Sequence, residues 1–276
     1  MYKDYRIVAV TPAGRRRYME LLIPQIIALR PIIDEYRLWA NTADTEDLAF
    51  MQTIAEQNPG FVMMERLSVK FNGNNSIYSF FKNCTDSRTI YVRFDDDVVL
   101  LDSADAFSGY LQYVIDHPEA FVVFANVLNN AILTHLHQRF GKIPLGAGKT
   151  TYHCLCDIGW RSPQFAHALH EEVLADPDLV RFRFDTPWLL YNHERVSVNC
   201  IAWRGAAFAS SGLGIDGSHD EEEWLACTAP RAMGLTNAIY GGFVCVHYAF
   251  FTQRAHLDST NILQRYKDLL LQRHKV

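Results

Sequence analysis

The stretch Thr89–Asp97, TIYVRFDDD, decides the fold. Its apolar part, Thr89–Phe94, is interpreted as a buried strand. The aspartates Asp95, Asp96 and Asp97 that follow would repel one another at the base of a cleft unless a positive charge lies among them. If the strand geometry continued, Asp95 and Asp97 would point to one side and Asp96 to the other, and the outer pair would suit Mg²⁺ or Mn²⁺. A solvated acidic turn is the alternative interpretation.

Strand and helix signals alternate along the residues before this stretch. Helices of about 10 to 15 residues between strands imply parallel βαβ units, with helices on both faces of a sheet. In such open sheets, ligands bind beyond the carboxyl ends of the strands. The expected strands are Arg6–Val10, Tyr36–Ala40 and Phe61–Leu67. One helix is expected after the turn 11–14, a second is expected to be capped by Thr45, and a third is expected to begin at Asn75 or Ser76.

The pattern after residue 102 is less regular. Strands are expected at Val196–Trp203 and Ala238–Val246, and an amphipathic helix, His256–His274, is expected at the end. The glycine-rich loop Gly141–Thr151 is not a phosphate-binding P-loop, because Ile143 stands where that motif needs its first glycine. We find no internal repeat and no linker, so residues 1–276 are expected to form one domain.

The composition excludes several classes of protein. A formal net charge of −5 and a pI near 6.1 argue against nucleic acid as a partner, which needs a clustered basic surface. No run of about 18 apolar residues suits a membrane span, and no secretory signal is recognised, so we expect a cytoplasmic protein. The six cysteines are interpreted as reduced core thiols. Cys154 and Cys156 lack the second ligand pair that a zinc site needs.

An apolar strand that ends in Asp-Asp-Asp behind an N-terminal βαβ half resembles the DxD signature of GT-A glycosyltransferases. The resemblance implies an α/β, Rossmann-like GT-A fold: a mostly parallel central sheet flanked by helices, with a smaller acceptor-side sheet. Residues 1–102 would be the nucleotide-binding half and residues 103–276 the acceptor-binding half. Asp95 and Asp97 match the outer aspartates, which in the family bind the metal that bridges the donor diphosphate. Asp96 would face the donor sugar or ribose.

The same resemblance implies a donor pocket at the ends of the first two strands. Gly14 would allow close approach of the backbone, and Arg15 or Arg17 would reach phosphate. Positive charge is unfavourable at a helix N-terminus, which favours a ligand role over a solvated helical turn. The residues expected to bind the donor are Thr11, Pro12, Gly14, Arg15, Asn41, Thr42, Lys70 and Asp96.

A second acidic cluster precedes a helix expected near residue 220. Inverting transfer needs a base that removes a proton from the acceptor hydroxyl. The family carries a Glu-Asp pair at this point: Asp220 matches its aspartate, whereas His219 stands where the glutamate would be, and Glu221 and Glu222 are alternative bases. A capping box, from Ser218 with Glu221 or Asp220 with Glu223, is a compatible interpretation.

His247, at the end of a predicted strand, matches by location the family's third metal ligand. A histidine that only forms hydrogen bonds at a strand end is the alternative interpretation. The cofactor implied by the resemblance is therefore Mn²⁺ or Mg²⁺, held by Asp95, Asp97 and His247.

These observations predict a metal-dependent glycosyltransferase that moves a sugar from a nucleoside diphosphate sugar, UDP by family habit, to a hydroxyl of a glycan or lipid-linked glycan, with inversion. A sugar nucleotidyltransferase is the first alternative, although it would usually carry a glycine-rich N-terminal loop with a lysine. A non-catalytic carbohydrate-binding protein would not need both acidic clusters. Arg265, Lys267 and Arg273 on the terminal helix suit either peripheral contact with the inner face of the membrane or a solvated surface.

Overall fold

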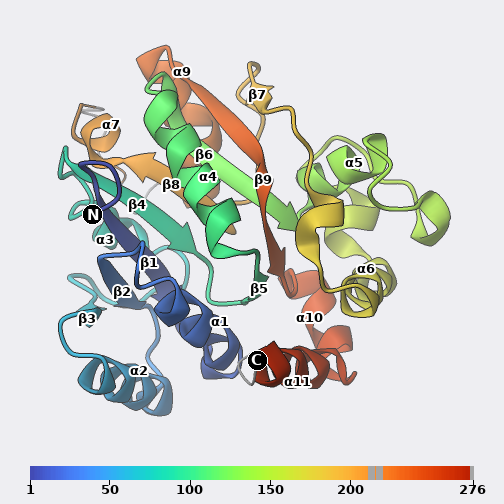
Figure 1. Ribbon diagram of the computed structural model, residues 1–276, viewed down its shortest axis with the longest axis horizontal. Helices are drawn as coiled ribbons and strands as arrows, with labels where there is room; N and C mark the ends of the chain where they lie inside the picture. Colours follow the sequence, from blue (N-terminus) through green and yellow to red (C-terminus); the bar gives the residue numbers. More distant parts are fainter. Residues whose placement is uncertain (211–214, 216–219, 274–276) are drawn as a thin grey trace.

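The computed structural model describes residues 1–210, 215 and 220–273, and it has an α/β architecture (Figure 1). The strands are β1 (Arg6–Ala13), β2 (Glu35–Ala40), β3 (Val62–Arg66), β4 (Thr89–Phe94), β5 (Val98–Leu101), β6 (Ala120–Leu128), β7 (Trp188–Leu190), β8 (Cys200–Arg204) and β9 (Thr236–His247). The α-helices are α1 (Arg16–Ala28), α2 (Thr45–Gln57), α3 (Tyr78–Phe81), α4 (Ala104–Asp116), α5 (Ala131–Arg139), α6 (Pro163–Ala175), α7 (Gly205–Ser210), α8 (Glu221–Glu223), α9 (Ala229–Met233), α10 (Phe251–Asp258) and α11 (Ile262–Arg273). Short 3₁₀ or π segments are η1 (Leu145–Ala147), η2 (Asp157–Arg161), η3 (Leu179–Phe182) and η4 (Trp224–Thr228).

The strands of the described residues form one nine-stranded sheet in the order β3-β2-β1-β4-β8-β6-β9-β5, with β7 paired to β9. β1 is parallel to β2 and β4, β2 to β3, and β6 to β9, whereas β8 is antiparallel to both β4 and β6. Six strands, β1–β4, β6 and β9, therefore run in one direction, and β5, β7 and β8 run in the other. The mostly parallel sheet is confirmed. The acceptor-side strands extend this sheet instead of forming a separate smaller one.

The direction of the sheet decides where the polar residues meet. Because six strands share one direction, their carboxyl ends lie along one edge, as the arrowheads of β4, β6 and β9 show in Figure 1. β8 runs the other way, so its beginning lies at the same edge. The segments that meet there follow β1, β2, β4 and β6, end β9 and precede β8, which is the position where open α/β sheets bind ligands.

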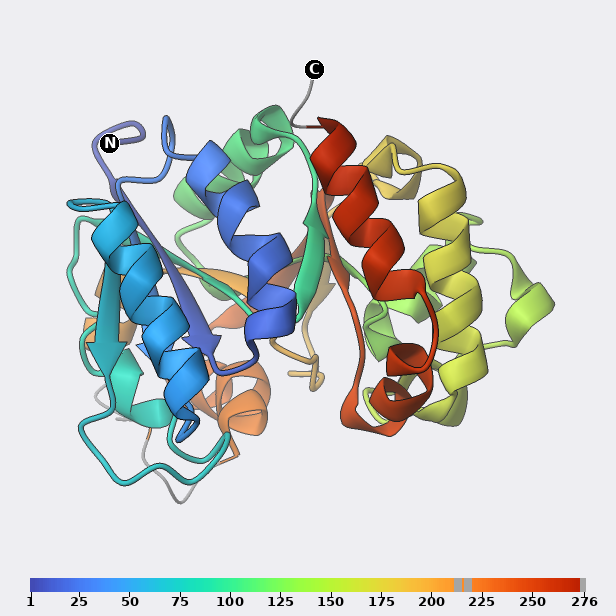
Figure 2. The same cartoon turned by 90° about the horizontal axis from the view of Figure 1, so that it is seen from below.

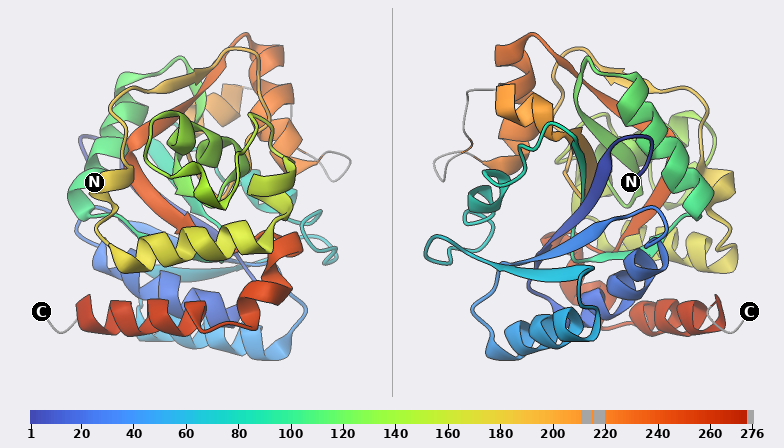
Figure 3. Two further views of the ribbon diagram at one scale, coloured as in Figure 1. Left: turned by 90° about the vertical axis from the view of Figure 1, so that its right-hand side faces the viewer. Right: turned by 60° about the vertical axis from the view of Figure 1, so that its left-hand side comes forward.

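Helices cover the sheet on both faces. Phe94 of β4 packs against Phe107 of α4. Tyr91, three positions earlier in the same strand, stacks on Trp203, and Trp203 stacks on Phe208 of α7. Since side chains alternate along a strand, α4 and α7 lie on opposite faces. Figure 2 shows α2, α1, α11 and α6 side by side, and Figure 3 shows the curl of the sheet with α11 running beside α6.

No helix in the described part of the chain is both long and apolar enough to cross a bilayer. The six cysteines are unpaired and buried, as expected of core thiols.

Several predicted boundaries are wrong by a few residues. β1 continues through Ala13, so the expected turn at 11–14 is mostly strand; β1 loses its β4 partner after Val10 but remains paired with β2. Asp44, not Thr45, caps α2, because its carboxylate accepts from the backbone N–H groups of Glu46 and Asp47. The third helix shrinks to four residues, and the single helix expected at 256–274 is the pair α10 and α11.

The second half contains elements that the sequence did not predict. β5 follows the aspartates after a tight turn, and β6 is a continuous buried run of nine residues. α4, α5, α6 and β7 were also not predicted. β8 and β9 confirm the two strands expected there, with shifted ends. His219, Ser218 and residues 274–276 lie outside the described residues.

Candidate active site

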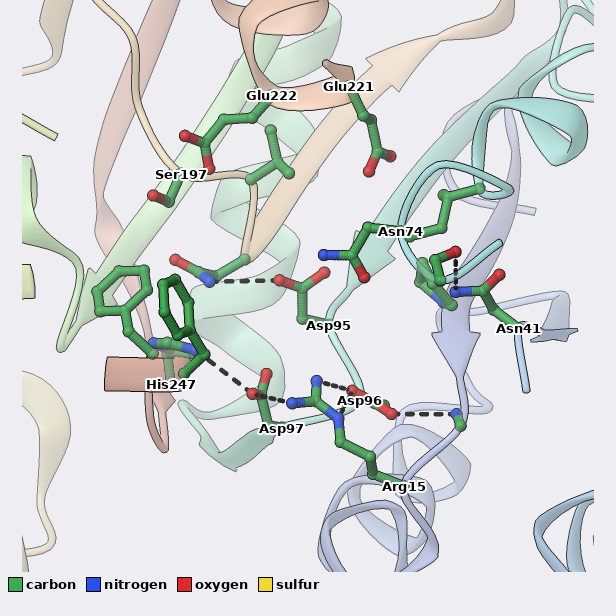
Figure 4. A pocket seen from close by; sticks show the side chains of 18 of the residues that line it. Arg15, Asn41, Asn74, Asp95, Asp96, Asp97, Ser197, Glu221, Glu222 and His247 are labelled. Carbon is green, nitrogen blue, oxygen red and sulfur yellow. Dashed lines mark hydrogen bonds and ion pairs between the residues drawn. The ribbon is translucent and has the colours of Figure 1, made fainter. Parts of the chain in front are cut away.

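A cavity of about 620 Å³ lies at the edge where the carboxyl ends of the strands meet. It brings together segments that are far apart in the sequence, from the start of α1 to the start of α10. Figure 4 shows Asp96 and Asp97 on one side of this space, Glu221 and Glu222 on the opposite side, and Asp95 between them. The polar residues that line it include Arg15, Asn41, Asn74, Arg93, Asp95, Asp96, Asp97, Arg195, Ser197, Asn199, Asp220, Glu221, Glu222, His247 and Arg254.

The three aspartates form a tight turn between β4 and β5. The N–H of Val98 donates to the Asp95 carbonyl at 3.1 Å, and the backbones on either side of the turn are held by Asn199 and Tyr248. The strand therefore ends at Phe94, and the alternation expected for Asp95 to Asp97 does not continue. Asp96 and Asp97 both contact Arg15, whereas Asp95 contacts Arg93 and Asn199.

Asp96 and Asp97 with Arg15, Arg254 and His247 form what we term the cationic flank of the turn. The guanidinium of Arg15 lies between the two carboxylates: Nε is 2.9 Å from Asp96 Oδ1, and Nη1 is 2.9 Å from Asp97 Oδ2. Arg254 Nη2 lies 3.0 Å from the same Asp97 oxygen. Burial alone would raise the pKa of Asp97, but Arg15, His247 and Arg254 bring it well below its usual value. Asp97 is therefore ionised at neutral pH.

Burial has the opposite outcome at Asp96. Its pKa is raised, because burial and the neighbouring aspartates outweigh the lowering effect of Arg15. The N–H of Gly14 donates to Asp96 Oδ2 at 3.0 Å, which ties this carboxylate to the end of β1. A side chain on Gly14 would place its Cβ 2.8 Å from the carbonyl oxygen of Asn41, so the close approach of these two loops requires glycine.

His247 is oriented as a metal ligand would be. Its Nδ1 lies 3.0 Å from the carbonyl oxygen of Asn129 and donates to it, and its Nε2 faces Asp97, 3.6 Å from Oδ2. Burial would lower the pKa of His247, but Asp97 brings it above its usual value, so a divalent cation would take the place of the Nε2 proton. The other oxygen of Asp97, Oδ1, is buried and has no hydrogen-bond partner among the residues that the structure describes. This donor set fits a divalent cation that takes one or two protein ligands and completes its shell with phosphate and water oxygens.

Asp95 does not complete that donor set. Its carboxylate lies 2.7 Å from Arg93 Nη2 and 3.3 Å from Asn199 Nδ2. Among the described residues, no three histidine, cysteine or acidic side chains are arranged to hold a metal on their own. The expected ligand trio of Asp95, Asp97 and His247 is therefore not assembled; the tight turn directs Asp95 away from the other two.

Asp95 and Glu221 with Arg93 form the acidic flank. Arg93 is buried within β4 and pairs with Asp95 on one side and with Glu221 on the other. Burial raises the pKa of Glu221 to about 7; the nearby charges of Asp95 and Glu222 add to this effect, and Arg93 opposes it. Glu221 is thus a carboxyl group that exchanges its proton near neutral pH, and it faces the cavity.

Asp220 has a different environment. Asp220 caps α8, as predicted: its carboxylate accepts a hydrogen bond from the N–H of Glu223 at 3.1 Å. The same carboxylate lies 2.9 Å from Arg195 Nη2. Its side chain is 54% exposed. Arg195 also pairs with Glu222 at 2.7 Å, so a single arginine neutralises several carboxylates of α8. Asp220 therefore lines the cavity as a solvated, ion-paired cap.

The remaining expected donor residues divide into two groups. Pro12, Gly14, Arg15, Asn41 and Asp96 line the cavity. Thr11, Thr42 and Lys70 do not line it: Thr11 is buried in the sheet and accepts from the Tyr36 hydroxyl, Thr42 accepts from the N–H of Asp44, and Lys70 is exposed in the loop after β3.

Several lining residues were missed by sequence reasoning. Arg93 had a signal, because a charged residue inside an apolar strand, two positions before Asp95, shares a face with it. Apolar side chains at the rim, namely Phe71, Leu155, Trp160, Phe250 and Phe251, come from loops and helix starts whose proximity the sequence does not indicate. The glycine-rich loop 141–151 does not line the cavity.

Comparison with known proteins supports the fold only. No family model and no curated protein sequence matches the chain. Among solved structures, GalNAc-T7 with UDP, GalNAc and Mn²⁺ is 13% identical over 95% of this chain and 47% of that chain, with a TM-score of 0.53. 4-Diphosphocytidyl-2C-methyl-D-erythritol synthase from Anaerococcus prevotii is 12% identical over 97% of this chain and 100% of that chain, with a TM-score of 0.48. The similarity to GalNAc-T7 confirms the predicted GT-A type of fold.

Proposed function

We propose that the chain is a metal-dependent glycosyltransferase that moves a sugar from a nucleoside diphosphate sugar to a hydroxyl group of a glycan acceptor, with inversion. One observation carries the proposal: a single cavity holds a cationic flank on one side of the aspartate turn and an acidic flank with a near-neutral carboxyl on the other. The first suits a departing diphosphate, and the second suits the removal of a proton.

The cationic flank provides the donor-binding side. Arg15 and Arg254 are placed to bind the diphosphate oxygens, since guanidinium groups match phosphate geometry. Asp97 and His247 would hold Mn²⁺ or Mg²⁺, which when bound neutralises the charge that develops on the leaving diphosphate. Pro12, Gly14 and Asn41 would contact the nucleoside, on the side of the cavity nearest β1 and β2.

The acidic flank provides the base. Glu221 takes the proton of the acceptor hydroxyl as its oxygen forms a bond to the anomeric carbon, and the bond from that carbon to the diphosphate oxygen breaks. A carboxyl whose pKa is about 7 is ionised in about half of the molecules at neutral pH and is a stronger base than an ordinary glutamate. We therefore propose Glu221 as the base in place of Asp220, whose carboxylate is solvated and paired with Arg195.

The sugar nucleotidyltransferase alternative shares the need for a cationic flank. Its attacking group is a phosphate oxygen, which is already ionised and needs no base. A near-neutral Glu221 therefore favours a hydroxyl acceptor over a phosphate acceptor.

The test is isothermal titration with UDP and with GDP, in Mn²⁺ and then in EDTA, on the wild type, on Asp97→Asn and on the matched control Asp105→Asn. Asp105 is exposed at the start of α4, outside the cavity. We expect one nucleotide to bind in Mn²⁺, with a loss of about 10²-fold or more in EDTA and in Asp97→Asn only.

A product assay separates the two enzyme classes. The proposed reaction releases nucleoside diphosphate from a nucleotide sugar. Release of pyrophosphate from a nucleoside triphosphate and a sugar phosphate would instead establish the nucleotidyltransferase. If no nucleotide binds, with or without a metal ion, the proposed function is wrong.

A further inference from the structure

Arg15 occupies the space between two potential metal-binding carboxylates. It is the last residue before α1, its side chain is 33% exposed, and those of Asp96 and Asp97 are 5% and 3% exposed. Three of its nitrogens contact them: Nε and Nη2 bond Asp96, and Nη1 lies 2.9 Å from Asp97. The geometry is a fork across two acids, which a lysine could not reproduce.

Arg15 competes with a free cation for Asp97. Oδ2 of Asp97 already contacts Arg15 and Arg254, and only Oδ1 is free of partners among the described atoms. A divalent cation between the Asp97 carboxylate and His247 would lie close to the guanidinium groups, where like charges in a partly buried site repel strongly. Arg15, Arg254 and a divalent cation together would bring excess positive charge to Asp97. The cation can therefore bind beside the arginines only if an anion binds with it.

A diphosphate supplies that negative charge. Its oxygens bind a guanidinium bidentately and also complete the coordination shell of a Mg²⁺ or Mn²⁺ ion. Arg15 has a partly exposed side chain at the cavity, so it can turn from the aspartates toward a ligand without unfolding the turn.

We infer that Arg15 keeps a free divalent cation off Asp97 and His247, and that the site takes the cation and the diphosphate together, with Arg15 passing from the aspartates to the diphosphate. The inference rests on the proposed function, which supplies the diphosphate. It assigns to Arg15 a positioning role in addition to donor binding: the residue sets the order in which ligands enter.

Titration with Mn²⁺ alone tests the blocking role. Arg15→Gln should bind Mn²⁺ about 10- to 100-fold more tightly than the wild type, because the loss of a charged hydrogen-bond pair frees the carboxylates. Arg16→Gln is the matched control: Arg16 is exposed and pairs with Glu20 on its own helix. Equal affinities in Arg15→Gln and the wild type, or no measurable binding by either, would overturn the inference.

Two further measurements separate blocking from misfolding and from failure of the proposed function. Arg15→Lys keeps the charge without the fork, so its affinity for Mn²⁺ should fall between those of Arg15→Gln and the wild type; thermal unfolding of all variants checks the fold. With UDP present, the wild type should gain Mn²⁺ affinity by about tenfold or more, and Arg15→Gln should gain less. If no nucleotide binds, the proposed function fails, whereas the titrations with Mn²⁺ alone still decide whether Arg15 blocks the site.

Discussion

On the cationic flank, Asp96 and Asp97 share Arg15, Arg254 and His247, whereas on the acidic flank Asp95 and Glu221 share a single buried arginine. Each flank is built on aspartates of one tight turn, and the two flanks differ in the ratio of positive to negative groups. An excess of cations lowers the pKa of Asp97, while a shortage of cations, together with burial, raises the pKa of Glu221. The turn thus separates anion binding from proton transfer within one cavity.

The largest effect is expected from removing the base on the acidic flank. Glu221→Gln keeps the shape and the contact with Arg93 but cannot accept a proton, so transfer should slow by about 10²- to 10⁴-fold. Binding of the nucleotide and Mn²⁺ should be unchanged, because those ligands lie on the other flank. Turnover of a nucleotide sugar and isothermal titration measure the two effects separately.

Asp220→Asn is the matched comparison, since it alters the adjacent carboxylate by the same change. We expect a much smaller loss of turnover. Stability should change by less than about 1 kcal/mol, because asparagine caps a helix about as well as aspartate and only the exposed ion pair with Arg195 is lost. If Asp220→Asn were instead slower than Glu221→Gln, Asp220 would be the base, and the acidic flank would not be the site of proton transfer.

Arg93→Met breaks the acidic flank by removing its internal cation. The two carboxylates would remain with no arginine between them, a change that typically costs about 3–5 kcal/mol of unfolding free energy. Arg93 lowers the pKa of Glu221, so its loss raises that pKa further above the unfolded value. Stability from a raised carboxyl pKa is present at low pH and is lost as pH rises through the folded pKa.

Urea unfolding at pH 5.5 and pH 8 measures this difference. The variant should lose more stability at pH 8 than at pH 5.5 relative to the wild type. Arg204→Met is a control on the neighbouring antiparallel strand, since Arg204 donates to the backbone carbonyl of Pro118 and does not contribute to the pKa shift of Glu221 that we assign to Arg93. Equal losses for Arg93→Met at both pH values would show that the electrostatic account of Glu221 is wrong.

The N-terminal half of the fold could be predicted because its signals are local. Apolar runs of five to seven residues, separated by helices with one apolar face, define β1 to β4. The rule for parallel sheets then places Gly14, Asn41 and the aspartates at one edge. The β4 strand was predicted without error. Arg15 was predicted to contact phosphate on the basis of its unfavourable position at a helix N-terminus, but its contact with Asp96 and Asp97 was not.

The second half and the details of the site could not be predicted, because they depend on contacts between distant segments. The direction of the Asp95 side chain follows from the turn into β5, and that strand pairs with β9, about 145 residues later. The raised pKa of Glu221 arises from burial, and the main charge that opposes it is Arg93, which lies 128 positions away. Periodicity carries no information about either contact. Thr11 shows the same limit: it is buried in the sheet, where it accepts a hydrogen bond from the Tyr36 hydroxyl of the neighbouring strand.

The smallest expected effect concerns the pH dependence of transfer. With a Glu221 pKa of about 7, the rate should rise with pH up to about that value and then level off, because the ionised form is the base. Glu222 is one of the charges that raise this pKa, so Glu222→Gln should move the rising limb to lower pH, by less than about one unit. Glu223→Gln is the matched control, since Glu223 is a half-exposed partner of Arg195 and is not among the main charges that shift the pKa of Glu221. The rising part of the pH–rate profile could stay in place in Glu222→Gln, or move equally in both variants. Either result would mean that the profile reports another group and that the acidic flank does not set the pKa of the base.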